Sequence, residues 1–190
     1  MCFGDSNTYG YDPRSYLGGR YPRSVRWTGR LEEDGWEVFN QGENGRSIPR
    51  LDFEIETAVQ SVQKARPDIL TVMLGSNDLL QCPGLTAGVC GERMERFLTA
   101  LLGKASEILL IAPPPMEPGD WVPDERLLIE SQRLAGCYKE LARRLNIYFA
   151  NAGAWNIELT YDGVHFSESG HRAFTDNLLK VLTAMFPDTK

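Results

Sequence analysis

The sequence contains few of the side chains that bind metals or build disulfide frameworks, with only two histidines and four cysteines among 190 residues. The cysteines are Cys2, Cys82, Cys90 and Cys137, and none of them forms a C-x-x-C pair. A zinc site is therefore not expected. Cys82 and Cys90 could bridge one loop, but scattered cysteines in a core-forming domain favour reduced thiols and a cytoplasmic location.

Long apolar runs and an excess of basic residues are also absent. No stretch approaches the ~18 apolar residues of a membrane span, and no basic-then-apolar leader is present. The net charge of −6 lacks the basic footprint that nucleic acids and anionic membranes require, so we expect neither as a partner. The first predicted strand begins at Met1, so residues before it, a leader among them, could be missing.

The composition is that of an ordinary globular domain, with 42% hydrophobic and 24% charged residues. The sequence shows no internal repeat, linker or low-complexity tract. Because this length suits one domain, we predict a single domain over residues 1–190.

Short apolar runs alternate with stretches of helical periodicity along the whole chain. The apolar runs predict strands at residues 1–3, 36–39, 68–74, 108–112 and 147–150. Apolar residues at helical spacing predict helices within residues 25–35, 51–66, 94–101, 127–145 and 167–185, the last capped by Ser167. This alternation predicts an α/β layer fold with a five-stranded, mostly parallel sheet.

Four polar or glycine-rich segments follow predicted strands: residues 4–10, 42–47, 75–78 and 162–165. In open parallel sheets, ligands bind at the carboxyl ends of the strands, which meet at one edge. Each segment alone could be an ordinary turn. Their convergence on one edge instead indicates a functional site.

Three residues in these segments can form an activated nucleophile. Ser6 is the candidate nucleophile, His165 can accept its proton, and Asp162 can orient the imidazole from three residues away. Two alternatives stay open from the residues alone. Gly4-Asp5-Ser6 could be only a turn, and His165 could be a surface histidine beside a tight turn at Asp162.

A developing oxyanion needs preorganised hydrogen-bond donors. The candidates are the backbone N–H groups of Ser6 and Gly42 and the side-chain amide of Asn77. Glycine at position 42 would let the backbone approach a substrate closely. Asn77 could equally be a turn residue. The Gly42-x-x-Gly45 spacing lacks the lysine of a phosphate loop, which disfavours a nucleotide or phosphate binder.

Other polar residues are weaker candidates. His171 lies early in the last predicted helix, and we expect it to have a solvated or capping role. Ser76, Ser167 and Ser169 lack a comparable turn signal. No G-x-S-x-G elbow occurs, which disfavours the α/β-hydrolase fold.

Taken together, the blocks resemble the SGNH (GDSL-type) hydrolase family. The matching residues are Gly4-Asp5-Ser6-Asn7, Gly42, Gly75-Ser76-Asn77-Asp78 and Asp162-Gly163-Val164-His165. The resemblance implies Ser6 as nucleophile, Asn77 and Gly42 as oxyanion donors, and Asp162 and His165 as orienter and base. It also implies a flavodoxin-like three-layer α/β/α sandwich and no cofactor.

Three further segments, Cys2–Gly10, Arg26–Gly29 and Pro113–Pro115, resemble the bacterial arylesterase and acyltransferase branch. That similarity implies a small-molecule, short-chain acyl ester as substrate, with transfer to an alcohol or peroxide in some members. Some members are homo-oligomers, so a homo-oligomer is possible here. The departure from the pattern is the short first strand, which could fray and loosen Ser6.

The substrate pocket is expected in loops that follow the strands, at residues 11–25 and 112–123. We expect Asp5, Tyr9, Trp121 and Val164 to line it. Met116 and Trp121, predicted to be exposed, could wall an apolar pocket, form an oligomer contact, or merely pack on the surface.

The leading hypothesis is a serine esterase acting on short-chain acyl esters through an acyl-enzyme on Ser6. A carbohydrate O-acetyl esterase is the alternative within this class. Thioester or lysophospholipid cleavage ranks lower because no long apolar lid is evident. The alternative from another class is a non-catalytic small-molecule-binding module of the same fold.

Overall fold

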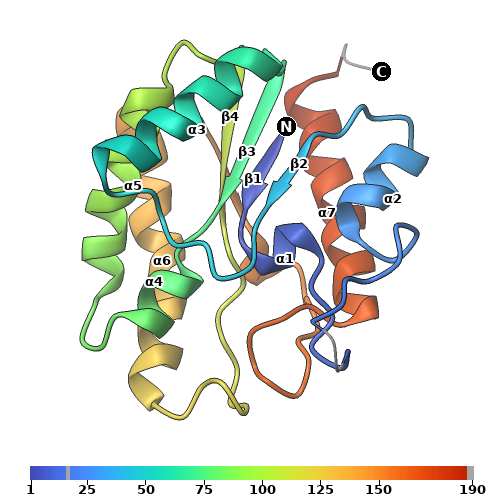
Figure 1. Ribbon diagram of the computed structural model, residues 1–190, viewed down its shortest axis with the longest axis vertical. Helices are drawn as coiled ribbons and strands as arrows, with labels where there is room; N and C mark the ends of the chain where they lie inside the picture. Colours follow the sequence, from blue (N-terminus) through green and yellow to red (C-terminus); the bar gives the residue numbers. More distant parts are fainter. Residues whose placement is uncertain (16–17, 188–190) are drawn as a thin grey trace.

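A computed structural model describes residues 1–15 and 18–187 (Figure 1), so residues 16–17 of the predicted loop lie outside the described part. In this part, five strands form one sheet in the order β2-β1-β3-β4-β5. They are β1 (Cys2–Gly4), β2 (Asn40–Gly42), β3 (Ile69–Met73), β4 (Glu107–Ala112) and β5 (Tyr148–Asn151). Each neighbouring pair in this order is parallel. The predicted α/β fold with a five-stranded parallel sheet is confirmed.

Helices cover both faces of the sheet. They are α1 (Ser6–Tyr9), α2 (Trp27–Glu33), α3 (Asp52–Ala65), α4 (Ser76–Gln81), α5 (Ala87–Leu101), α6 (Glu125–Leu145) and α7 (Glu168–Met185). Figure 1 shows α3, α5 and α6 on one side of the sheet and α2 and α7 on the other. None of the helices in the described ranges combines the length and apolar character needed to cross a bilayer.

Side-chain alternation along the strands divides the interior into two apolar cores, one on each face. Phe3, Val72 and Leu110 belong to the core with α3, α5 and α6. Leu109 and Ile111 belong to the core with α2 and α7. The near-continuous apolar runs therefore mark strands that are buried on both faces, as predicted.

The second strand lies later than predicted, so the strand expected at residues 36–39 is wrong. Trp36 and Val38 pack partly buried against the core of α2 and α7 without strand pairing, and Phe39 is 54% exposed. The paired segment is the polar β2, an edge strand whose Asn40 amide donates to Thr8 O and Thr28 Oγ1. A polar edge strand carries no apolar signal, which explains the misplacement.

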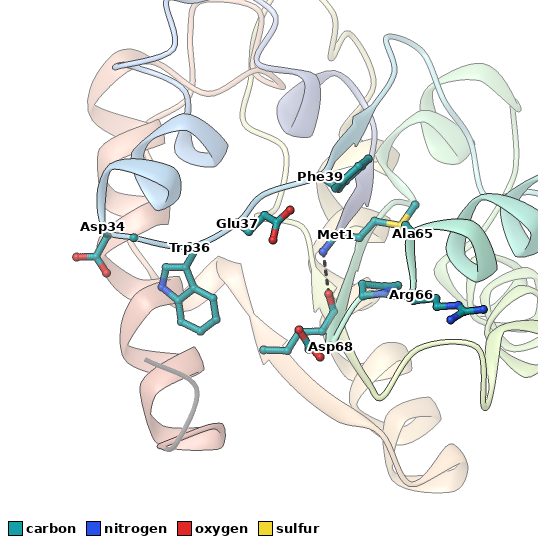
Figure 2. Close-up of a pocket in the computed structure, with 11 residues that line it drawn as sticks. Met1, Asp34, Trp36, Glu37, Phe39, Ala65, Arg66 and Asp68 are labelled. Atoms are coloured by element: carbon teal, nitrogen blue, oxygen red, sulfur yellow. Dashed lines mark hydrogen bonds between the residues drawn. The ribbon is translucent and has the colours of Figure 1, made fainter.

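The first strand is short but lies inside the sheet, between β2 and β3. The Met1 amino group donates to Ile69 O over 2.9 Å, a bond dashed in Figure 2, and Cys2 N–H donates to Phe39 O over 2.8 Å. Hydrogen bonds on both edges hold a strand that would otherwise fray. The expected looseness of Ser6 is therefore not found.

Candidate active site

Ser6 begins α1 immediately after β1, at the carboxyl edge of the sheet. The Asp5 carboxylate caps this short helix by accepting from Asn7 N–H over 3.0 Å. Gly10, with φ of +89°, ends the helix in the left-handed conformation that glycine favours. The strand, the Asp5 cap and the helix end at Gly10 together fix the position of Ser6, which is only 6% exposed.

The predicted nucleophile, base and orienter come together in one hydrogen-bonded chain. His165 Nε2 lies 3.0 Å from Ser6 Oγ, and His165 Nδ1 lies 2.7 Å from Asp162 Oδ2. The other Asp162 oxygen accepts from the backbone N–H groups of Val164 and His165, each over 2.9 Å. This is the geometry that an activated serine requires.

Electrostatics keep the Asp162 side chain ionised. Its complete burial favours the neutral acid, but the hydrogen bonds from the His165 ring and from two backbone N–H groups outweigh burial and lower its pKa to about 2. A carboxylate at this position accepts the His165 Nδ1–H bond. The Nε2 lone pair then faces Ser6 and can take its proton.

Asn7 connects the nucleophile to the base, a contact that the sequence analysis missed. Its Nδ2 donates to Val164 O over 3.0 Å, and its Oδ1 accepts from Phe166 N–H over 2.9 Å. These two backbone groups flank His165. The sequence offered one indication of this role: Asn7 directly follows Ser6 in the Gly4–Asn7 segment that resembles the SGNH family.

Asn77 lies in the first turn of α4 and lines the same cavity as Ser6 and His165, as predicted. Its Nδ2 donates to Arg46 O over 3.1 Å. An amide nitrogen carries two hydrogens, so the second can serve a bound oxyanion.

Gly42 does not occupy the predicted place. Its N–H already donates to Asn40 Oδ1 over 2.8 Å, and the residue lies outside the cavity lining. A Cβ here would lie 2.1 Å from Tyr9 N, so the missing side chain lets α1 pack on β2 rather than admit a substrate. Gly45, three residues later, lines the cavity instead and has a φ of +74°. Its N–H has no acceptor among the described residues.

The cavity has a volume of about 460 Å³ and combines apolar with amide side chains. It is lined by Ser6, Tyr11, Asn44, Gly45, Asn77, Leu80, Gln81, Trp121 and His165. The ring centres of Tyr11 and Trp121 lie 4.8 and 4.9 Å from that of His165. Trp121 was predicted here by name, whereas Tyr11 was covered only as the first residue of the predicted pocket loop at residues 11–25.

The other predicted pocket residues lie elsewhere. Asp5 is a buried helix cap, Tyr9 stacks against the Arg20 guanidinium at 4.4 Å, and Val164 packs in the apolar core. Met116 was predicted to be exposed but is only 4% exposed and belongs to that same core. These side chains are held by other contacts, so closeness to Ser6 or to a strand end in the sequence does not place a side chain in the cavity.

The model of the GDSL-like lipase/acylhydrolase family matches residues 2–173. The chain belongs to this family. Membership in the GDSL-like family makes it a carboxylic ester hydrolase, and the predicted resemblance is confirmed. Comparison with curated protein sequences finds no match.

Solved structures similar to this GDSL-like hydrolase include two esterases. An aryl esterase from M. smegmatis is 28% identical, with a TM-score of 0.84 and coverage of 97% of this chain and 98% of that one. A carbohydrate acetylesterase from Sinorhizobium meliloti is 25% identical, with a TM-score of 0.84 and the same coverage. A G-D-S-L family protein from Veillonella parvula, 20% identical with a TM-score of 0.73 over 96% of both chains, shares the fold.

His171 of this GDSL-like hydrolase is buried, so the expectation of a solvated residue is wrong, and its capping contact is to a helix other than its own. Its Nδ1 accepts from Trp27 N–H over 3.4 Å at the start of α2, a different helix from its own. Burial, aided by the Arg26 charge, lowers its pKa to about 3. Its position on the inner face of α7, one turn before Phe174, was the available signal.

Two other features lie apart from the cavity. All four cysteines, Cys82 and Cys90 among them, are free. Among residues 1–15 and 18–187, no group of three or more His, Cys, Asp or Glu side chains could hold a metal ion. A hollow of about 320 Å³ at the amino ends of the strands has Trp36, Arg66 and Asp68 in its wall, and none of its lining residues is Ser, Cys or His (Figure 2).

Proposed function

We propose that this GDSL-like hydrolase is a serine esterase that cleaves short-chain acyl esters through an acyl-enzyme on Ser6. The observation that carries the proposal is the hydrogen-bonded chain from Asp162 through His165 to Ser6, which opens into the cavity. A non-catalytic binding module would have no need for this chain.

In acylation, Ser6 Oγ attacks the ester carbonyl carbon while its proton passes to His165 Nε2. The carbonyl electron pair moves to the oxygen and forms an oxyanion. When the tetrahedral intermediate collapses, the bond to the alcohol oxygen breaks, and the leaving alkoxide takes the proton from His165. Asp162 stabilises the imidazolium throughout.

In deacylation, a water molecule takes the place of the departed alcohol. His165 Nε2 accepts a proton from the water as its oxygen attacks the acyl carbon, and then returns that proton to Ser6 Oγ as the acid leaves. An alcohol that enters instead of water gives a new ester, which is the proposed acyltransferase activity.

The proposed oxyanion hole consists of the Ser6 N–H, the Gly45 N–H and Asn77 Nδ2. All three residues line the cavity, and Gly45 replaces the predicted Gly42 because the Gly42 N–H is already bonded to Asn40. Removing one such donor typically lowers kcat by about 10²–10³-fold.

The cavity supports a small substrate with an apolar or ring-shaped portion. Tyr11, Leu80 and Trp121 form its apolar wall, and Trp121 is 49% exposed at the rim. The similarity to an aryl esterase favours aryl esters as substrates, and the similarity to a carbohydrate acetylesterase favours O-acetylated sugars as the second candidate. An exposed indole ring can stack against either an aryl group or a sugar face. A homo-oligomer contact through Trp121 stays a prediction.

The test compares the wild-type protein with Ser6→Ala, using p-nitrophenyl acetate and a fluorophosphonate probe. We expect the wild type to hydrolyse the ester and to become labelled, and the variant to do neither. A wild-type protein that is unlabelled and turns over no ester would contradict the proposal. Rates on phenyl acetate, longer acyl esters and acetyl-xylan then separate the two substrate classes.

A further inference from the structure

Helix α4 and the loop at residues 43–48 are joined by side-chain hydrogen bonds. Asn77 Nδ2 donates to Arg46 O over 3.1 Å, and Asp78 Oδ2 accepts from Ile48 N–H over 2.8 Å. The two proposed oxyanion donors that lie outside α1 sit on these two segments, Gly45 on the loop and Asn77 on the helix. Their spacing therefore depends on how the loop is held against the helix.

One side chain, that of Gln81, bonds both donor residues directly. Its Nε2 donates to Gly45 O over 2.8 Å and to Asn77 Oδ1 over 3.4 Å. Its Oε1 accepts from Ser47 Oγ over 3.3 Å. Gln81 follows Asn77 by four residues in α4, which places both on one face of the helix.

These bonds control the direction in which each donor points. Gln81 Nε2 donates to Asn77 Oδ1 and so holds that oxygen toward Gln81. The Asn77 amide then keeps its Nδ2 toward Arg46 O, with one hydrogen left for a ligand in the cavity. The bond to Gly45 O fixes the peptide plane that follows Gly45, and so limits rotation at this glycine, whose own N–H lies in the preceding plane. Donors held in place before the reaction stabilise an oxyanion more than mobile ones.

We propose that Gln81 is a positioning residue that holds the Gly45 and Asn77 donors in the geometry of the oxyanion hole. The inference depends on the proposed function, because it assigns a role in the same site. Gln81 lines the same cavity, but its hydrogen bonds go to Gly45, Ser47 and Asn77 and not to Ser6 or His165. Its side chain is exposed. Its loss should therefore leave the core packing intact.

The test replaces Gln81 with methionine, which has a similar length but no amide hydrogen. We expect kcat for p-nitrophenyl acetate to fall roughly tenfold, less than the loss of a donor itself, with KM and the thermal midpoint unchanged. Inhibition by benzeneboronic acid, which forms a tetrahedral anion on the serine, should weaken by a similar factor. Gln81→Glu, which puts an acceptor against two oxygens, should be at least as impaired.

The matched control is Gln60→Met on the exposed face of α3, where the amide donates to Glu56 of the same helix and lies outside the cavity lining. It should leave kcat, KM, the thermal midpoint and the boronic acid inhibition unchanged. An active wild type, an inactive Ser6→Ala and a Gln81→Met with unchanged kcat and boronate affinity would overturn this inference alone. A change in KM only, or a lower thermal midpoint with kcat retained, would overturn it too. An inactive wild type would overturn the proposed function and this inference with it.

Discussion

At the scale of single residues, Asn7 shows how a buried amide can set a catalytic distance. Its two hydrogen bonds reach the backbone on both sides of His165, across 157 and 159 positions of sequence. Because Asn7 adjoins Ser6, these bonds link the helix of the nucleophile to the loop of the base. The 3.0 Å contact between Ser6 and His165 depends on that link.

Replacing Asn7 with alanine should lower both stability and activity. The change leaves a buried carbonyl and a buried N–H without partners, and each costs about 1–3 kcal/mol. The thermal midpoint and kcat for p-nitrophenyl acetate measure the two effects. Asn177→Ala is the control, because that amide also bonds a backbone carbonyl, Ala173 O, but in α7 away from the cavity. A kcat equal to that of Asn177→Ala would contradict the positioning role.

At the scale of elements, two glycines in one short segment are required for different physical reasons. A Cβ at Gly42 would meet backbone atoms of α1, Tyr9 N at 2.1 Å and Thr8 C at 2.5 Å. A Cβ at Gly45 would find only Gln81 Nε2, at 3.7 Å, but φ there is +74°. Gly42 thus allows an element to pack, and Gly45 allows a loop to turn.

Gly42→Ala should therefore be the more damaging substitution. The clash is with backbone, so α1 must move and take Ser6 with it. Gly45→Ala keeps its N–H and costs roughly 1–2 kcal/mol of backbone strain. Urea unfolding gives the two stabilities, and the rate of fluorophosphonate labelling reports the position of Ser6. Equal stability and labelling in the two variants would contradict this assignment.

At the scale of the whole molecule, the His171 side chain on α7 contacts both α2 and the loop that precedes α2. Its ring lies 5.2 Å from that of Tyr21 and 5.4 Å from that of Phe166, centre to centre. Burial, together with the Arg26 and His165 charges, lowers its pKa to about 3, while the Asp12 charge acts in the opposite direction. An unfolded histidine has its ordinary pKa of 6.5.

The folded protein should lose stability as the pH falls from 6.5 towards 3, because only the unfolded chain protonates His171 in that range. The expected contribution is up to about 1.4 kcal/mol per pH unit. Asp5 acts in the opposite sense between pH 3.8 and about 6, since burial raises its pKa to about 6. Asp162, whose pKa is lowered from 3.8 to about 2, adds a loss only below pH 4.

His171→Gln isolates the histidine, because the carboxyl contributions are the same in both proteins and a glutamine oxygen can still accept from Trp27 N–H. Urea unfolding at pH 7, 6, 5 and 4.5 should show a flatter decline in the variant. Parallel declines in the two proteins would show that His171 does not set the acid sensitivity.

Local patterns were enough to predict much of this molecule. Apolar runs located four strands within one or two residues, because buried parallel strands need apolar side chains on both faces. The polar edge strand β2 has no such requirement and was misplaced. The short helices α1 and α4 were expected as turns, since four to six residues carry no readable helical period.

The residue types and short spacings of the sequence by themselves determined which residues are candidates for nucleophile, base and orienter, because Asp162 and His165 meet within one turn and Ser6 lies just after a strand. Only the tertiary structure decided which glycine faces the cavity, what Asn7 and Gln81 bond, and that His171 is buried. Apart from the Gln81–Asn77 bond within α4, these properties are set by contacts between residues 34 to 159 positions apart, and no local pattern encodes such contacts.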